Sequence, residues 1–182
     1  HQVLERWHKA GGRSGELLAL ASEELAAMQA HPLVRSLWWP RLARALVWID
    51  EEVARLAREE GRSVAASEIK GTITFGGVKV HGRADRIDRL ADGSLAIVDY
   101  KTGAPPSRAM VADGNALQLG VLGLIADGGG FAGVNGAPEG FEYWSLGRDR
   151  KRGEDEVQKL TDQYVKHADE AAMAKEKEIL TT

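Results

Sequence analysis

GRADRIDRLADGSLAIVDYKTG, residues 82–103, is the stretch of sequence that decides the fold. Residues 78–90 contain Val78, Val80 and Ile87, and LAIVDY follows as a compact apolar run, so the pattern predicts two strands, 78–90 and 95–100. Ala91-Asp92-Gly93 between them is a hairpin signal. A loop of three residues places a residue with positive φ where Gly93 stands, so the turn chemistry favours that length over the two-residue alternative, Asp92-Gly93.

The length of this loop decides which side chains face each other. With three residues, Asp85 lies directly opposite Asp99, whereas with two residues it lies opposite Tyr100 and the two carboxylates are on opposite faces. Asp99 and Lys101 are two residues apart on one strand, so they share a face and Tyr100 points away from it. The favoured register brings the two Asp side chains to about 5 Å between Cβ atoms.

Two facing carboxylates on neighbouring strands are destabilising unless a cation lies between them. Oxygen ligands of this kind suit Mg²⁺ or Mn²⁺, and a lysine on the same face can hold an attacking water or stabilise charge on a phosphate. The alternative is a solvent-facing hairpin in which the ordinary surface charges are Asp85, Arg86, Asp88 and Arg89. Asp99 and Lys101 favour the metal site, because they end an apolar strand where charge is otherwise unfavourable.

Asp88 lies three residues past Asp85, so it falls on the other face of the strand. We expect it to be structural and to form an ion pair with Arg86 or Arg89.

Composition is that of one globular domain: 182 residues, 43% hydrophobic, 28% charged and a net charge of −3. No run approaches the roughly 18–20 apolar residues of a membrane helix. The absence of cysteine excludes disulfides, thiolate metal sites and iron–sulfur clusters. The net charge does not indicate nucleic-acid binding, which would require a local basic cluster. The chain begins with His1 instead of Met, which predicts a fragment of a longer protein.

The chain divides into a helical part at 1–61, a sheet and site-bearing core at 62–146, and a C-terminal helical part at 147–182, all within one domain. Apolar spacing predicts helices at 1–10, 16–30, 33–60, 116–126 and 154–179, and further strands at 69–75 and 141–146. Eight glycines between residues 120 and 140 predict a flexible loop. The tryptophans at 38, 39 and 48 are expected in the core or at an interface.

The residues around this hairpin resemble a known family, the PD-(D/E)XK nucleases, and within it the RecB-like branch. Its signature is G-x-x-D, a strand, and a hydrophobic run ending in D-Y-K, which Gly82-Arg83-Ala84-Asp85 and Val98 to Gly103 match. The sequence of this stretch is most similar to that of the C-terminal nuclease domain of AddB-type helicase–nuclease subunits. Upstream, His1-Gln2-Val3-Leu4-Glu5 fits the H-x-x-L-E motif of this branch; downstream, Gln118 fits a Q-x-x-x-Y motif in which Leu122 replaces Tyr.

The resemblance implies a restriction-endonuclease-like α/β fold, with a mixed central sheet flanked by helices and a helical N-terminal third. It also implies roles for single residues: metal ligands at His1, Asp85, Asp99 and the carbonyl of Tyr100, a catalytic Lys101, and a supporting Gln118. Many AddB-type domains carry four cysteines for an iron–sulfur cluster; this chain has none, so we expect no cluster. With Leu122 in place of Tyr, we expect one contact to a phosphate or nucleotide to be lost, but no metal ligand.

The implied activity is an Mg²⁺-dependent exodeoxyribonuclease, with Mn²⁺ able to substitute, acting on single-stranded DNA ends during double-strand break processing. The implied partners are an AddA-type helicase–nuclease subunit and the rest of the same chain, in the bacterial cytoplasm at the nucleoid and away from membranes. A catalytically silent nuclease-fold module for DNA binding or scaffolding is the alternative, and a free-standing nuclease is a third.

Other polar residues are open to two interpretations. His1 could be a frayed terminus, and Glu68 could be a further acid near the metal or a solvated loop carboxylate. Arg148, Arg150 and Lys151 could contact the DNA backbone or form an ordinary charged turn.

Overall fold

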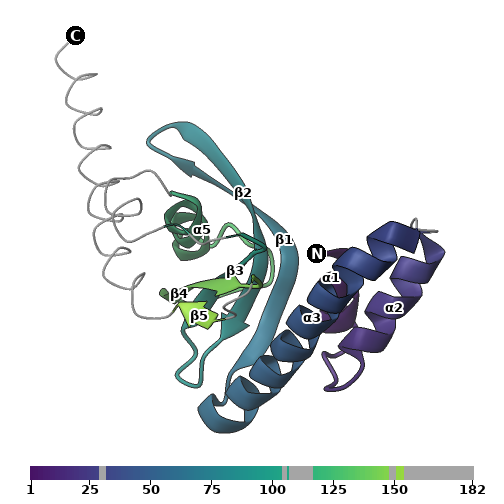
Figure 1. Ribbon diagram of the computed structural model, residues 1–182. Helices are drawn as coiled ribbons and strands as arrows, with labels where there is room; N and C mark the ends of the chain where they lie inside the picture. The colour runs from purple at the N-terminus through teal and green to yellow at the C-terminus, as the bar shows by residue number, and fades with distance from the viewer. Residues whose placement is uncertain (29–31, 104–105, 107–116, 148–150, 154–182) are drawn as a thin grey trace, which may run out of the picture.

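The computed structural model describes residues 1–28, 32–103, 106, 117–147 and 151–153. A five-stranded sheet in the order β1-β2-β3-β4-β5 has helices on both faces (Figure 1). The elements are α1 (Gln2–Lys9), α2 (Leu17–Ala27), α3 (Pro32–Glu60), β1 (Ser63–Phe75), β2 (Val78–Arg89), β3 (Leu95–Lys101), α5 (Gln118–Asp127), β4 (Pro138–Ser145) and β5 (Lys151–Gly153). No helix in these described stretches is both long and apolar enough to cross a bilayer.

The sheet is mixed because one connection crosses over. β1, β2 and β3 pair antiparallel in sequence order, whereas β3 and β4 are parallel and the crossover between them contains α5. The α/β architecture with a mixed sheet and a helical N-terminal part is therefore confirmed.

The β2–β3 hairpin has the three-residue loop that the sequence favoured. Arg86 pairs with Val98 and Arg89 with Leu95, while the N–H of Leu90 donates to the carbonyl of Ser94 at 2.9 Å. Gly93 has φ of 89°, a conformation that glycine adopts without steric cost. One step beyond Arg86 and Val98, this register brings Asp85 opposite Asp99.

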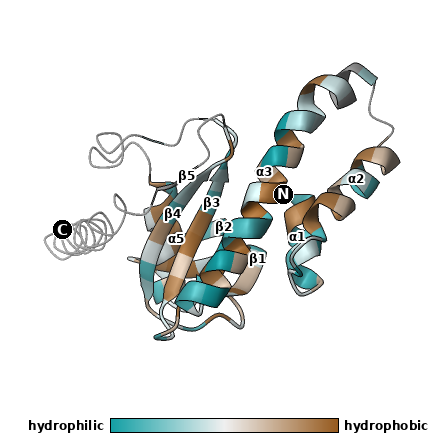
Figure 2. Cartoon of the chain, turned by 60° about the horizontal axis from the view of Figure 1, so that its bottom comes forward, coloured by the Kyte–Doolittle hydropathy of each residue, from teal (hydrophilic) through white to brown (hydrophobic). Residues whose placement is uncertain are grey.

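Each face of the sheet packs on a separate core. On the α5 face, β2 and β3 contribute Ala84, Ile87, Leu95 and Ile97, which pack with Leu119, Leu122, Ile125 and Phe141. On the other face, Val98, Tyr100 and Trp144 pack with Leu4, Trp7, Leu17, Ile49 and Leu56 of the first three helices. Figure 2 shows hydrophobic segments, in brown, along the central strands and on α1. Since β3 contributes to both cores, its side chains from residue 95 to 100 are all buried.

The tryptophans of α3 differ in their surroundings. Trp48 packs on Trp144 with ring centres 5.2 Å apart, and Trp39 is partly buried against the same core. Trp38 is 73% exposed, so it lies outside the core, and a place at an interface stays a prediction for it. The physical reason is length: the first part of α3 extends past the sheet, where it has no strand to cover (Figure 2).

The glycine-rich segment after α5 is anchored to the sheet, which corrects the expectation of a flexible loop. Phe131 and Val134 are buried, and the N–H of Thr72 in β1 donates to the carbonyl of Gly130 at 3.0 Å. A Cβ at Gly71 would lie 2.5 Å from the Phe131 ring, so here glycine permits close packing.

A buried ionic network lies on the helical face of the sheet. Arg62 donates to Asp88 and to Glu142, each at 2.6 Å. The guanidinium of Arg86 lies 4.0 Å from the Trp144 ring centre, and its Nε is 2.9 Å from Asp88. The expected pairing of Asp88 with Arg86 is confirmed, and the solvent-facing alternative is wrong for both. Arg62 is a partner that the sequence did not indicate.

Replacing Arg62 with Ala should strongly destabilise the fold, because Asp88 and Glu142 would remain buried without their shared cation. We expect the free energy of unfolding to fall by about 3–5 kcal/mol, measured by urea denaturation with circular dichroism. The control is Arg58→Ala, at an exposed arginine of α3, which should change stability by no more than about 0.5 kcal/mol. A loss of about 1 kcal/mol or less for Arg62→Ala would equal an exposed ion pair and contradict this prediction.

Candidate metal centre

Asp85 lies where the regular pairing of β2 with β3 ends. The last paired residues are Arg86 and Val98, and the backbone N–H of Tyr100 donates to the Asp85 carboxylate at 2.9 Å. In a regular strand, residues three apart point to opposite faces of the sheet. Ala84 and Ile87 nevertheless pack in the same core, so the alternation of side chains is interrupted between them. The carboxylate of Asp85 is therefore held at an irregular position of the strand by a backbone hydrogen bond.

Glu68 extends the row of acids to a third strand. On β1 it lies between Ser67, which pairs with Arg86, and Ile69, which pairs with Ala84, so the register places it opposite Asp85. Its φ of 51° is in the left-handed region, which costs a residue with a Cβ about 1–3 kcal/mol. The side chain is only 4% exposed, so the interpretation as a solvated loop carboxylate is wrong.

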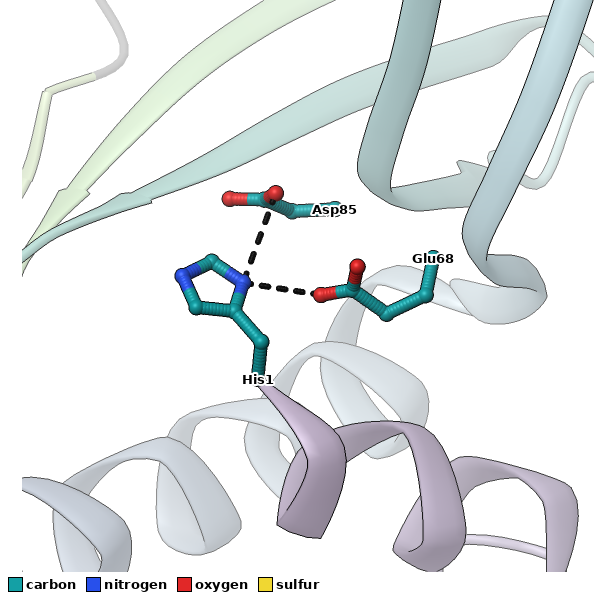
Figure 3. Close-up of side chains that lie close together, drawn as sticks. All are labelled: His1, Glu68 and Asp85. Atoms are coloured by element: carbon teal, nitrogen blue, oxygen red, sulfur yellow. Dashed lines mark hydrogen bonds and ion pairs between the residues drawn. The ribbon is translucent and has the colours of Figure 1, made fainter.

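His1 brings the start of α1 to these two acids. Its Nδ1 lies 2.8 Å from Oε1 of Glu68 and 3.5 Å from Oδ1 of Asp85 (Figure 3). One donor atom from each of the three residues lies within 4.8 Å of the others. The H-x-x-L-E histidine is thus next to Asp85, as the resemblance implied, and Glu68 accompanies it.

Asp99, Lys101 and Gln118 form a second group beside the first. The Nζ of Lys101 is 2.8 Å from Oδ2 of Asp99 and donates to Oε1 of Gln118 at 2.9 Å, while Nε2 of Gln118 donates to Oδ1 of Asp99 at 2.6 Å. Gln118 is the first residue of α5, so the crossover between β3 and β4 positions it. Leu122, which stands where the family pattern has Tyr, is buried in the core one turn further along α5.

Burial and mutual repulsion oppose the charged form of both aspartates. Burial raises the pKa of Asp85, the Tyr100 N–H lowers it, and the charge of Glu68 raises it further. Burial also raises the pKa of Asp99, where Lys101 acts in the opposite direction and the charge of Asp85 adds to the increase. In each case the net shift is upward, so the chain's own groups only partly stabilise these negative charges.

This donor set fits a divalent cation. An imidazole nitrogen and two carboxylate oxygens converge, and a third carboxylate lies one strand away. Mg²⁺ and Mn²⁺ bind through a few carboxylates with water filling the remaining positions, and Mn²⁺ also accepts imidazole. His1, Glu68 and Asp85 are the residues that would hold the ion; Asp99 and the carbonyl of Tyr100 as further ligands stay predictions.

The candidates for DNA contact lie largely outside the described residues, and a second histidine of α1, His8, has a different environment from His1. Arg148, Arg150 and the expected helix at 154–179 lie outside the described residues, and Lys151 is described only by its backbone pairing with Ser145. His8 packs against Trp7, and burial, together with the charge of Arg86, lowers its pKa to about 3.

The sequence contained a signal that could have placed Glu68. Gly76-Gly77 is typical of a two-residue hairpin, and both glycines have positive φ, 53° and 77°. Counting back along both strands from Phe75 and Val78, which pair, brings Glu68 opposite Asp85. The extra residue that shifts this register lies between Val64 and Ala66, beyond Glu68.

Affinity for Mn²⁺ should fall with decreasing pH, starting above the ordinary aspartate pKa of about 3.9. The carboxyls of Asp85 and Asp99 have raised pKa values, so they take up protons at a higher pH than usual, and a protonated carboxyl is a poor ligand. Calorimetric titration at several pH values measures this effect.

Protonation of the imidazole would also weaken binding, so the control is His1→Gln, which lacks that titration. The decline should persist in this variant. An affinity for Mn²⁺ that stays constant down to pH of about 4 would contradict the prediction.

The chain was compared with protein families, curated proteins and solved structures. A 33-residue segment is 79% identical to the ribosome-recycling factor of Erythrobacter litoralis (strain HTCC2594), covering 18% of each chain. The ribosome-recycling factor of Novosphingobium aromaticivorans is 69% identical over 32 residues, 18% of this chain and 17% of that protein. The chain thus spans less than a fifth of the length of the curated relatives it matches.

Among solved structures, SSO0001 aligns with 72% of this chain and 68% of its own, at 16% identity and a TM-score of 0.35, which is too weak to relate the two site by site. The family comparison covers far more of the sequence. The model of the PD-(D/E)XK nuclease superfamily matches residues 1–180, which include His1, Glu68, Asp85, Asp99 and Lys101. The chain therefore belongs to the PD-(D/E)XK nuclease superfamily.

Proposed function

We propose that this chain is a nuclease domain that hydrolyses phosphodiester bonds in DNA with Mg²⁺, or with Mn²⁺ in its place. One observation carries this proposal: Lys101, an ammonium donor, lies beside a row of three carboxylates on adjacent strands. His1 and Gln118 complete the row at its two ends. Membership of a nuclease superfamily supports the same reaction class.

The chain's own residues supply orientation and charge. A bound divalent cation would increase the acidity of water and offset the charge that develops on the phosphate. Lys101 can donate to the attacking water or to a phosphate oxygen, and Gln118 holds its Nζ in place at 2.9 Å. The Tyr100 N–H fixes the orientation of the Asp85 carboxylate. Attack on phosphorus then breaks the bond to the leaving oxygen, which takes up a proton.

The finer assignment is also a proposal. The match of Gly82-Arg83-Ala84-Asp85 and Val98 to Gly103 to the RecB-like signature supports an AddB-type exonuclease that processes double-strand breaks, leaving 5′-phosphate and 3′-hydroxyl ends. In this role, an AddA-type subunit would deliver single-stranded DNA ends, and the complex would act on the bacterial chromosome. The second candidate, a silent scaffolding module, has less support, because Asp85, Asp99 and Lys101 are all present and placed together.

Cleavage of labelled single-stranded DNA with Mg²⁺ or Mn²⁺ tests the proposed function. Asp99→Ala should abolish cleavage and weaken Mn²⁺ binding. Lys101→Ala should reduce cleavage about 100-fold or more while Mn²⁺ still binds, because it removes a charge donor and no carboxylate. Lys79→Ala, at an exposed lysine of the β1–β2 hairpin, is the control and should retain activity. A wild-type protein that neither cleaves nor binds Mn²⁺ would favour the silent module.

Gln118→Ala should lower the cleavage rate about 10- to 100-fold, the usual cost of losing a partner that orients a functional group. The side chain bridges Asp99 and Lys101, so its loss frees both. Leu117→Ala, at the half-exposed residue just before α5, is the matched control. If Gln118→Ala and Leu117→Ala have the same thermal stability and cleave at the same rate, Gln118 has no positioning role.

A further inference from the structure

Glu68 divides its carboxylate between two partners. Oε1 is 2.8 Å from Nδ1 of His1, and Oε2 forms an ion pair with Nη2 of Arg83. The two side chains of this second pair differ in exposure: Glu68 is 4% exposed, whereas Arg83 is 50% exposed. Arg83 comes two residues before Asp85 on β2, so a half-exposed cation lies next to the candidate metal centre.

The Glu68–Arg83 pair competes with a cation at the centre. Arg83 is half-exposed, so water partly screens its attraction to Glu68, and a pair screened in this way contributes only about 0–1 kcal/mol. A divalent ion held by His1, Glu68 and Asp85 would attract the same carboxylate more strongly. Binding of the ion would then weaken the attraction between Glu68 and Arg83 and leave a half-exposed guanidinium beside the site.

A guanidinium in this position suits a phosphate. It has five N–H donors in a planar arrangement that matches two oxygens of a phosphate group, and it stays charged at any working pH. The other cation of the centre, Lys101, is engaged by Asp99 and Gln118. Arg83 therefore has the more accessible positive charge of the two.

A groove next to Glu68 gives a nucleic-acid strand room to lie along. Its volume is about 640 Å³, and its walls come from α1, the outer edge of β1 and residues 132–134. Lys70 lines this groove and is the cross-strand neighbour of Arg83, so Arg83 lies next to a cation of the groove wall.

We propose that Arg83 binds a phosphate of the DNA strand next to the scissile bond. Before a divalent cation binds, Arg83 is paired with Glu68; the cation then replaces Arg83 as the partner of this carboxylate. This inference rests on the proposed nuclease function. Two opposite effects follow for Arg83→Ala: weaker DNA binding and tighter binding of the metal ion.

The test compares wild type, Arg83→Ala, Arg83→Lys and Arg58→Ala. Arg58 is the matched control, because it is 71% exposed and pairs with a neighbouring glutamate, Glu59, on the opposite side of the sheet from α5. Mn²⁺ affinity is measured by calorimetry without DNA. Affinity for a labelled single-stranded oligonucleotide is measured in Ca²⁺ at several salt concentrations, with its intactness checked on a gel.

For Arg83→Ala we expect the slope of log affinity against log salt to flatten by about 0.7, the change for one phosphate contact on a single strand. We expect Mn²⁺ to bind about two- to fivefold tighter, because the half-exposed Arg83 no longer competes for Glu68. Arg83→Lys should retain the slope, and Arg58→Ala should match wild type in both measurements.

The outcomes separate this proposal from the proposed function. If the DNA affinity of Arg83→Ala depends on salt as that of Arg58→Ala does, Arg83 makes no phosphate contact. If the Mn²⁺ affinity of Arg83→Ala equals that of the wild type, Arg83 does not compete with the ion for Glu68. If the wild type binds Mn²⁺ and cleaves DNA, either of these results for Arg83→Ala leaves the proposed nuclease function unaffected. A wild type that binds no Mn²⁺ overturns both.

Discussion

Electrostatic repulsion among three carboxylates is the constraint around which this structure is organised. Glu68, Asp85 and Asp99 lie side by side on β1, β2 and β3, at least partly removed from water. Such an arrangement is unfavourable unless positive or hydrogen-bond-donating groups converge on it. Each of those groups comes from a different part of the chain: His1 begins α1, Lys101 ends β3, and Gln118 begins α5. The helices on both faces of the sheet therefore complete the centre as well as the core.

The two faces of the sheet treat charge in different ways. On the helical face, Asp88 forms ion pairs with two arginines, Arg62 and Arg86. The guanidinium of Arg86 packs against the Trp144 ring. Three residues before Asp88, burial raises the pKa of Asp85, the N–H of Tyr100 lowers it only in part, and the charge of Glu68 raises it further. Two buried cations beside one carboxylate are typical of a structural ion pair, whereas a carboxylate with less compensation leaves a site able to attract a cation. Strand alternation separates the two roles within one short stretch of β2.

Much of this centre could be predicted from local sequence. The loop at Ala91-Asp92-Gly93 has a defined length, and the length alone determines that Asp85 faces Asp99 and that Asp88 faces away. The same kind of counting from Gly76-Gly77 would have included Glu68. The partners of Asp88 and the buried position of Phe131 could not be predicted in this way, because they depend on segments that pack together from distant parts of the chain.

The sequence by itself determined the strands, the turn that joins them, and the residues that carry charge at their ends. These are short-range properties: a glycine with positive φ sets a loop, and a two-residue period sets a face. Only the tertiary structure decided that His1 reaches Glu68, that Arg83 pairs with the same carboxylate, and that Gln118 bridges Asp99 and Lys101. Those contacts require α1 and α5 to pack on opposite faces of the sheet, and packing depends on the shape of two whole cores, which no local pattern encodes.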